Sequence, residues 1–118
     1  MSLIVPHVYL SSLKVAADET FLRSHKIKHV LSCDHFSSLK YKPEQGIKRH
    51  KMIKMKDNHI EPISEYFHLA FDFLHTAVLA QENVLVHCLK GMSRSATIVT
   101  SYLMLAHSMR YSEALALV

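Results

Sequence analysis

The residues best suited to covalent chemistry lie in one short stretch of this 118-residue chain. It combines a thiol, a guanidinium and two hydroxyls with one of the chain's two glycines: His87-Cys88-Leu89-Lys90-Gly91-Met92-Ser93-Arg94-Ser95. A cysteine thiolate is a nucleophile, and an arginine offers a planar, two-pronged donor that fits two phosphate oxygens. A glycine lets the backbone curl or approach a ligand closely. These residue types together predict chemistry on a tetrahedral oxyanion.

Two buried elements are predicted on either side of this stretch. Residues 83–87 form a short apolar run that predicts a buried strand. Residues 93–107 predict a helix that is apolar nearly all round, and such a helix is central and buried. A loop from a strand end to a helix start directs backbone N–H groups and the positive end of the helix dipole at one point. We therefore expect an anion site, in a field that favours the thiolate form of Cys88.

The other predicted elements alternate along the chain. We expect strands at residues 8–10, 28–33 and 47–55, and a helix at residues 18–26. Residues 64–79 predict an amphipathic helix with Phe67, Phe71, Leu74 and Val78 on one face. Ser112 is the expected N-cap of a last helix that has barely begun when the sequence stops. This order predicts one α/β domain over residues 1–118, with a central, mostly parallel sheet flanked by helices.

Composition excludes several classes of protein. With 49% hydrophobic and 20% charged residues, the chain is not disordered. No apolar run approaches the roughly 20 residues of a membrane span, and the apolar start is too short for a signal peptide. Two cysteines cannot form a disulfide framework or a cysteine-rich zinc site. His25 and His29 lack an acidic or cysteine partner at ligand spacing, so we expect no metal. Because the sequence shows neither a membrane span nor a signal peptide, we expect a cytoplasmic or nuclear protein.

Positive charge is concentrated in the middle of the chain. The formal net charge is +4, yet residues 40–56 alone carry seven basic side chains against Glu44: Lys40, Lys42, Lys48, Arg49, Lys51, Lys54 and Lys56. Such a basic band favours anionic partners, namely nucleic acid, anionic lipid or phosphorylated protein. A solvated, positively charged strand and loop is the alternative, and charge alone leaves both open.

The stretch around Cys88 resembles the H-C-x5-R-S signature of the cysteine-based protein tyrosine phosphatases, in particular their dual-specificity branch. Residues 8–12 with Ala16 and Ala17 resemble the N-terminal segment of that branch, although Ser11 stands where glycine is usual. Residues 27–33 are similar to its first core strand, and residues 64–73 to the helix before the signature. The resemblance covers essentially the whole chain. It implies a protein tyrosine phosphatase-like fold, and we expect the last C-terminal helices of that fold to be missing from residues 1–118.

The resemblance implies a two-step hydrolysis without cofactor or metal. Cys88 would attack phosphorus to give a cysteinyl-phosphate, which water then hydrolyses. Asp57, 31 residues upstream, matches the general acid, and Ser95 matches the hydroxyl that bonds the cysteine sulfur and helps it leave. His87 matches the residue that orients the loop and supports the thiolate. The remaining loop residues would supply the phosphate-binding N–H groups: Leu89, Lys90, Gly91, Met92, Ser93 and Arg94.

The resemblance also implies a phosphorylated protein as substrate, with phosphotyrosine and phosphoserine or phosphothreonine both accepted. Leu89 and Met92 stand where phosphoinositide phosphatases tend to carry basic residues, so we expect no lipid substrate. The expected partner is a phosphorylated protein, and neither a membrane nor a nucleic acid. The basic band would then receive the acidic surroundings of a phosphosite. A surface left open by the missing helices would allow dimerisation. The alternative function is a pseudophosphatase, a phosphate-binding interaction module without turnover, although such modules typically lack the cysteine. A sulfur transferase has a similar loop, but its flanking segments do not match.

Cys33 is the second cysteine, and it ends the strand predicted at residues 28–33. If that strand lies beside the one that ends at Cys88, both thiols emerge at the carboxyl edge of the sheet. Some members of the resembling family carry a cysteine there that captures the oxidised nucleophile as a reversible disulfide. We keep this redox role open beside the alternative that Cys33 is a small buried hydrophobe.

Overall fold

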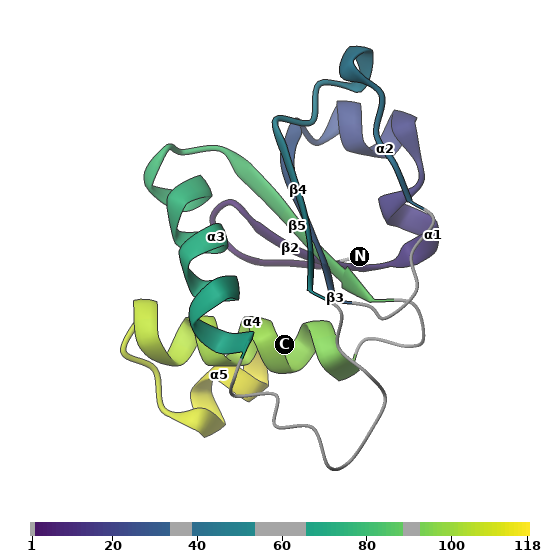
Figure 1. The fold of residues 1–118 in the computed structure, drawn as a ribbon. Coiled ribbons are helices and arrows are strands. Elements are labelled where there is room, and N and C mark those ends of the chain that lie inside the picture. Colours follow the sequence, from purple (N-terminus) through teal and green to yellow (C-terminus); the bar gives the residue numbers. More distant parts are fainter. Residues whose placement is uncertain (1, 34–38, 54–65, 89–92) are drawn as a thin grey trace.

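The computed structural model describes residues 2–33, 39–53 and 66–88 and, except for the side chain of Ser93, residues 93–118 (Figure 1). The strands in this part of the chain are β1 (Ser2–Val5), β2 (Val8–Ser12), β3 (Ile27–Cys33), β4 (Arg49–Ile53) and β5 (Asn83–Cys88). The helices are α1 (Leu13–Ala16), α2 (Glu19–Ser24), α3 (Phe67–Leu79), α4 (Ser93–Ala106) and α5 (Tyr111–Leu117), with a short 3₁₀ turn, η1 (Pro43–Gln45).

The five strands form one sheet in the order β1-β2-β5-β3-β4. Strands β2, β5, β3 and β4 run parallel to one another, and only β1 is antiparallel. The expected α/β class and mostly parallel sheet are confirmed. Strand β5 is central, because β2 and β3 both pair with it, and this explains its continuous run of apolar residues from Val84 to Val86.

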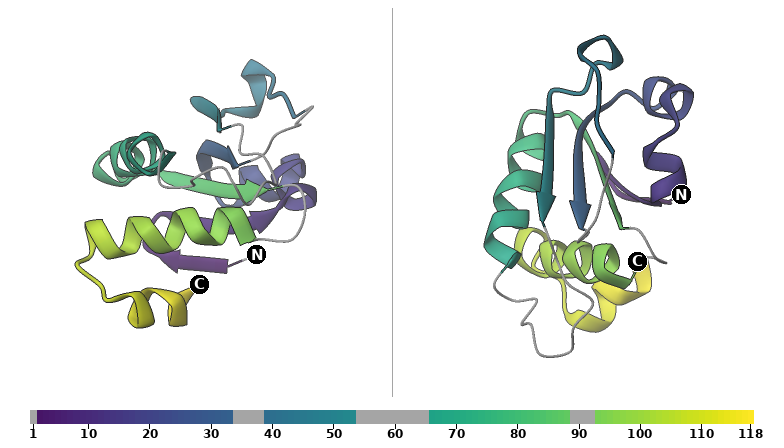
Figure 2. Two further views of the ribbon diagram at one scale, coloured as in Figure 1. Left: turned by 60° about the horizontal axis from the view of Figure 1, so that its bottom comes forward. Right: turned by 45° about the vertical axis from the view of Figure 1, so that its right-hand side comes forward.

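Helices cover both faces of the sheet (Figure 2). One face packs against α3 and α4, and its core includes Leu31, Cys33, Val86 and Cys88. The opposite face packs against α1 and α2, and there Val30 and Leu85 lie in a smaller core with Ala16 and Leu22. Successive side chains along a strand point to opposite faces, which is why Cys88 faces α4 whereas His87 faces away from it.

Two short N-terminal elements were absent from the sequence prediction. Strand β1 is an edge strand that pairs with β2 through a turn at His7, whose φ is 75°. Helix α1 is a single turn between β2 and α2. Neither has the length from which a period is recognised. The helix predicted at 18–26 is present as α2 but is shorter, since it ends at Ser24. At its start the Asp18 side chain accepts a hydrogen bond from the Phe21 N–H at 3.1 Å.

The two C-terminal helices correct two expectations. Helix α4 is not buried on every side, since Leu105 is 64% exposed and Met104 is exposed as well. Its buried face carries Ile98, Val99, Tyr102 and Leu103. The last helix begins at Tyr111 rather than after Ser112, because the Glu113 carboxylate accepts a hydrogen bond from the Arg110 N–H at 3.1 Å and so caps an earlier start.

Candidate active site

The candidate site lies at the carboxyl edge of the sheet, where β5 ends and α4 begins. Cys88 is the last residue of β5, and it is flanked by Ser12 of β2 in the pairing register. Helix α4 starts at Ser93, only five residues later. The crevice beyond the carboxyl ends of parallel strands is where α/β proteins bind ligands, and a helix N-terminus there favours an anion. The predicted strand and helix around the motif are therefore confirmed.

Three of the predicted site residues lie together at this edge. The Sγ atom of Cys88 is 3.3 Å from the Oγ atom of Ser95, and both side chains are buried. Arg94 is half-buried in the first turn of α4, next to Ser95. The thiol thus has the Ser95 hydroxyl within hydrogen-bond distance. The residue before Ser95 carries a guanidinium, the kind of donor that a transferred phosphoryl group requires.

Other predicted residues lie outside the described part of the chain. These are the proposed general acid Asp57 and four residues of the proposed phosphate cradle: Leu89, Lys90, Gly91 and Met92. Ser93 is described only as the first residue of α4. Their roles stay predictions.

His87 is fully buried on the opposite face of the sheet from Cys88. Its Nε2 atom lies 2.6 Å from the Oγ atom of Ser32 on β3. The same Oγ atom lies 2.8 Å from the Nε2 atom of His50 on β4. Burial, reinforced by the nearby His50, lowers the pKa of His87 to about 4, and burial also lowers the pKa of His50. Both rings are therefore neutral at pH 7.

Neither Ser32 nor His50 was predicted as a site residue. The signal was present in the sequence only as polar residues within strands that must be buried. The pairing of β3 with β5 brings Ser32 directly beside His87. The pairing of β3 with β4 places Met52 opposite Ser32, so His50 lies two residues back along β4, on the same face of the sheet.

Cys33 lies on the same face as Cys88, in the same apolar core. Ser32 pairs in register with His87, so the next positions of the two strands are Cys33 and Cys88. Both are buried, and no disulfide joins them. The expected juxtaposition of the two strand ends is confirmed, whereas a redox role for Cys33 stays a prediction.

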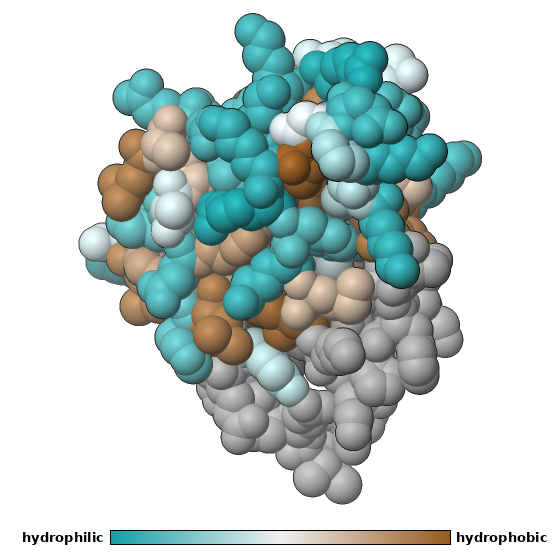
Figure 3. All heavy atoms as spheres, turned by 45° about the horizontal axis from the view of Figure 1, so that its top comes forward, coloured by the Kyte–Doolittle hydropathy of each residue, from teal (hydrophilic) through white to brown (hydrophobic). Residues whose placement is uncertain are grey.

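The described part of the basic band lies mostly away from the site. Hydrophilic residues cover the end of the molecule around η1 (Figure 3), whereas Cys88 lies at the opposite edge of the sheet. Lys48 forms an ion pair with Glu82, whose other oxygen is 2.9 Å from His29. Arg49 donates hydrogen bonds to His29 and to the carbonyl of Phe73. Lys48 and Arg49 are thus held in a network that ties β4 to β3 and α3.

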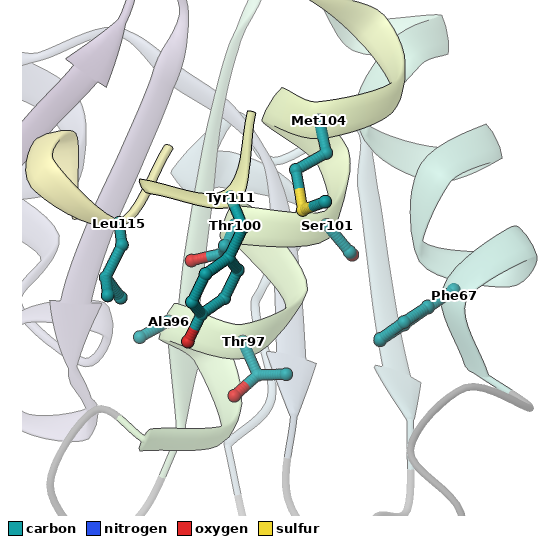
Figure 4. Close-up of a pocket in the computed structure, with 8 residues that line it drawn as sticks. All are labelled: Phe67, Ala96, Thr97, Thr100, Ser101, Met104, Tyr111 and Leu115. Carbon is teal, nitrogen blue, oxygen red and sulfur yellow. The ribbon is translucent and has the colours of Figure 1, made fainter. Parts of the chain in front are cut away.

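A groove of about 440 Å³ lies on the outer side of α4, between α3 and α5 (Figure 4). Its lining is mainly apolar and comprises Phe67, Ala96, Thr97, Thr100, Ser101, Met104, Tyr111 and Leu115. Cys88, Arg94 and Ser95 are not among its lining residues. Across the described residues, no cluster of three or more His, Cys, Asp or Glu side chains could hold a metal, and no helix is long and apolar enough to span a membrane.

Comparison with known proteins decides the family. The model of the dual specificity phosphatase catalytic domain matches residues 8–118. This chain belongs to the dual specificity phosphatase family. Its class is accordingly that of the phosphoprotein phosphatases, the cysteine-based enzymes that the signature around Cys88 had indicated.

Individual family members agree with this assignment. Dual specificity protein phosphatase 1B of Arabidopsis thaliana is 36% identical over 118 residues, which are 100% of this chain and 69% of the relative. Dual specificity protein phosphatase 2 of Mus musculus is 36% identical over 116 residues, covering 94% of this chain and 34% of the relative. The crystal structure of DUSP15 superimposes with a TM-score of 0.89 at 31% identity, covering 98% of this chain and 72% of that one. The chain thus spans from about one third to about seven tenths of these relatives' length.

Proposed function

We propose that this domain hydrolyses phosphotyrosine and phosphoserine or phosphothreonine in proteins through a cysteinyl-phosphate intermediate. The observation that carries the proposal is the Cys88 thiol at the end of the central strand, 3.3 Å from the Ser95 hydroxyl and just before the N-terminus of α4. Thiolate attack on phosphorus transfers the phosphoryl group from the substrate oxygen to sulfur, and attack of water then returns it as inorganic phosphate.

Each remaining residue has a proposed part in these steps. Arg94 would bind two oxygens of the phosphoryl group as a bidentate donor. Asp57 would protonate the leaving oxygen of the substrate in the first step and accept a proton from water in the second. Ser95 would stabilise the sulfur as it leaves. Backbone N–H groups of residues 89–94 would bind the remaining charge, so that the reaction proceeds without a metal.

The test is turnover of para-nitrophenyl phosphate and of phosphopeptides by the purified chain. We expect Cys88→Ser and Arg94→Ala each to abolish turnover, because one removes the nucleophile and the other the phosphoryl-binding cation. Cys88→Ser should still bind a phosphate analogue, since the anion site is retained. Phosphate binding without turnover by the wild-type chain would instead support the pseudophosphatase alternative. Near-native turnover by Cys88→Ser would contradict the mechanism.

We propose a phosphorylated protein as the partner, and the cytoplasm or nucleus as the location, where a catalytic thiol stays reduced. Exposed apolar side chains on α4 and α5 support dimerisation through that surface, with Leu105 64% and Tyr111 59% exposed. Sedimentation velocity tests this last point: a monomer at all concentrations would contradict it.

A further inference from the structure

The buried contact of two histidines with one serine hydroxyl gives the active site an additional component. Ser32 is fully buried, and among the described residues its hydroxyl hydrogen-bonds these two rings alone. Its one proton therefore points to one ring, and its oxygen accepts from the other. The two imidazoles must therefore play opposite hydrogen-bonding roles. The second ring nitrogen of His87, Nδ1, determines in which direction the two hydrogen bonds run.

The Nδ1 atom of His87 is buried and has no hydrogen-bond partner among the described residues. If His87 accepted from Ser32 at Nε2, its only proton would lie on Nδ1 as a buried donor without an acceptor. Buried N–H groups without partners are rare, and a bare ring nitrogen is the smaller penalty. The hydrogen-bond network therefore assigns the proton of His87 to Nε2, from which it is donated to Ser32. Ser32 then donates to the Nε2 atom of His50.

Of the three hydrogen-bonded side chains, His50 is the one that solvent reaches. Its side chain is half-buried, whereas Ser32 and His87 are completely buried. The ring of Tyr41 packs edge-on against it with centroids 5.0 Å apart, and the Tyr41 hydroxyl donates to the carbonyl of Ala16 at 2.7 Å. Burial raises the pKa of Tyr41, so this phenol stays neutral near pH 7. Lys48, two residues before His50, is paired with Glu82.

We propose that His50 is a positioning residue for the phosphatase reaction, which orients His87 and fixes its tautomer through the Ser32 hydroxyl. This inference rests on the proposed function, because its effect on turnover requires Cys88 to be the nucleophile. His87 directly precedes Cys88 on the central strand, and Ser32 is the one described side chain that hydrogen-bonds its ring. The orientation of His87 thus depends on a hydroxyl whose own direction depends on His50.

Protonation of His50 reverses the direction of both hydrogen bonds of Ser32. An imidazolium donates at both nitrogens, so Ser32 must accept from His50 and turn its own proton toward His87. The proton of His87 then moves from Nε2 to the partnerless Nδ1. Because burial lowers the pKa of His50, this reversal occurs only below the usual range of histidine, and activity is expected to fall there with one additional ionisation.

Two substitutions of His50 separate positioning from packing. His50→Gln places a neutral amide near the position of Nε2, so it keeps the hydrogen bond to Ser32 but cannot titrate. His50→Phe keeps the ring against Tyr41 but loses the hydrogen bond. We expect His50→Phe to lower kcat about three- to tenfold, the size of one lost hydrogen bond, with KM unchanged. His50→Gln should restore kcat at pH 7 and remove one ionisation from the acid limb of the pH profile.

The tautomer is measured directly by ¹H–¹⁵N correlation spectra of histidine-labelled protein. Cys88→Ser is used as the background, so this reading does not depend on turnover. At pH 7 we expect the proton of His87 on Nε2, and in the His50→Phe background a mixture of tautomers. His25→Gln, a change of a histidine at the end of α2, should alter neither reading.

The outcomes distinguish this proposal from the proposed function. A proton on Nδ1 of His87 at pH 7, or unchanged kcat in His50→Phe, overturns the role of His50. An acid limb in His50→Gln identical to that of the wild type does so too. Absence of turnover in the wild-type chain, with the Nε2 tautomer present, would instead refute the proposed function and with it any effect on catalysis.

Discussion

The Ser95 hydroxyl lies 3.3 Å from the Cys88 sulfur, across the gap between the end of β5 and the first turn of α4. A hydrogen bond at this place stabilises negative charge on sulfur, which develops when the thiolate leaves the phosphoenzyme. We expect Ser95→Ala to slow the second step about ten- to a hundredfold, the range for one hydrogen bond to a charged group. Rapid-quench kinetics with para-nitrophenyl phosphate should show a burst in the variant. A slower first turnover without a burst would place the role of Ser95 in phosphoryl transfer to sulfur.

Asp57→Asn tests the general acid. Loss of proton donation should lower kcat about 10²- to 10⁴-fold for phenyl and alkyl phosphates. Substrates whose leaving group is itself acidic need little protonation and should lose far less. The ratio of kcat between the two substrate kinds is the measurement, with Asp72→Asn on the exposed side of α3 as control. An equal loss on both kinds would assign the acid role to another residue.

Cys33→Ser tests the redox role. Neighbouring strands are about 4.8 Å apart, and a disulfide requires Cα atoms within about 7 Å, so the register of β3 and β5 permits a Cys33–Cys88 bond. Peroxide oxidises the Cys88 thiolate to a sulfenic acid, and the Cys33 thiol then displaces water to form the disulfide. We expect the cross-linked peptide in wild type and its absence in Cys33→Ser, with activity recovered by dithiothreitol only when Cys33 is present. Equal recovery would leave Cys33 as packing.

The buried histidines predict a loss of stability in mild acid. Burial lowers the pKa of His87 from 6.5 to about 4, so the unfolded chain binds a proton first as the pH falls below 6.5. The contribution of His87 to stability is therefore complete above pH 6.5 and decreases as the pH falls toward 4. Between pH 6.5 and pH 5 the loss of unfolding free energy that His87 causes should amount to about 1–2 kcal/mol. Urea unfolding of wild type and His87→Gln at both values measures it, and an equal decline in the two proteins would contradict it.

The elements that the sequence predicted correctly are those with a long run or a clear period. The apolar run from Val84 to Val86 predicted β5, and the motif after it predicted the start of α4. The amphipathic period over residues 64–79 predicted α3 and its end at Leu79, although the helix begins at Phe67. Its buried face is centred on Ala70, Phe73 and Leu74, with Phe67 and Phe71 at its border. The period indicates a helix, while the neighbouring elements decide which of several apolar residues are covered.

What could not be predicted depends on pairing between segments distant in sequence. The exposure of Leu105 depends on where α5 packs, and a helix that is apolar all round does not specify this. The contact between His50 and Ser32 exists only because β3 and β4 pair in one register. Charge alone left open whether the basic band binds an anionic partner or is merely solvated, whereas the structure shows Arg49 bonded to His29 and stacked on the Phe73 ring. Charge counts do not distinguish a solvated cation from one held in a network.

The central position of β5 has a consequence for the exchange of backbone hydrogens with solvent. Its amides are bonded between β2 and β3, so they are released only when the sheet itself separates, whereas those of the edge strand β1 can open locally. The segment that carries Cys88 should thus belong to the slowest-exchanging group of the chain. Substitutions that weaken the core will then lower the number of active molecules while leaving the turnover of each folded molecule unchanged.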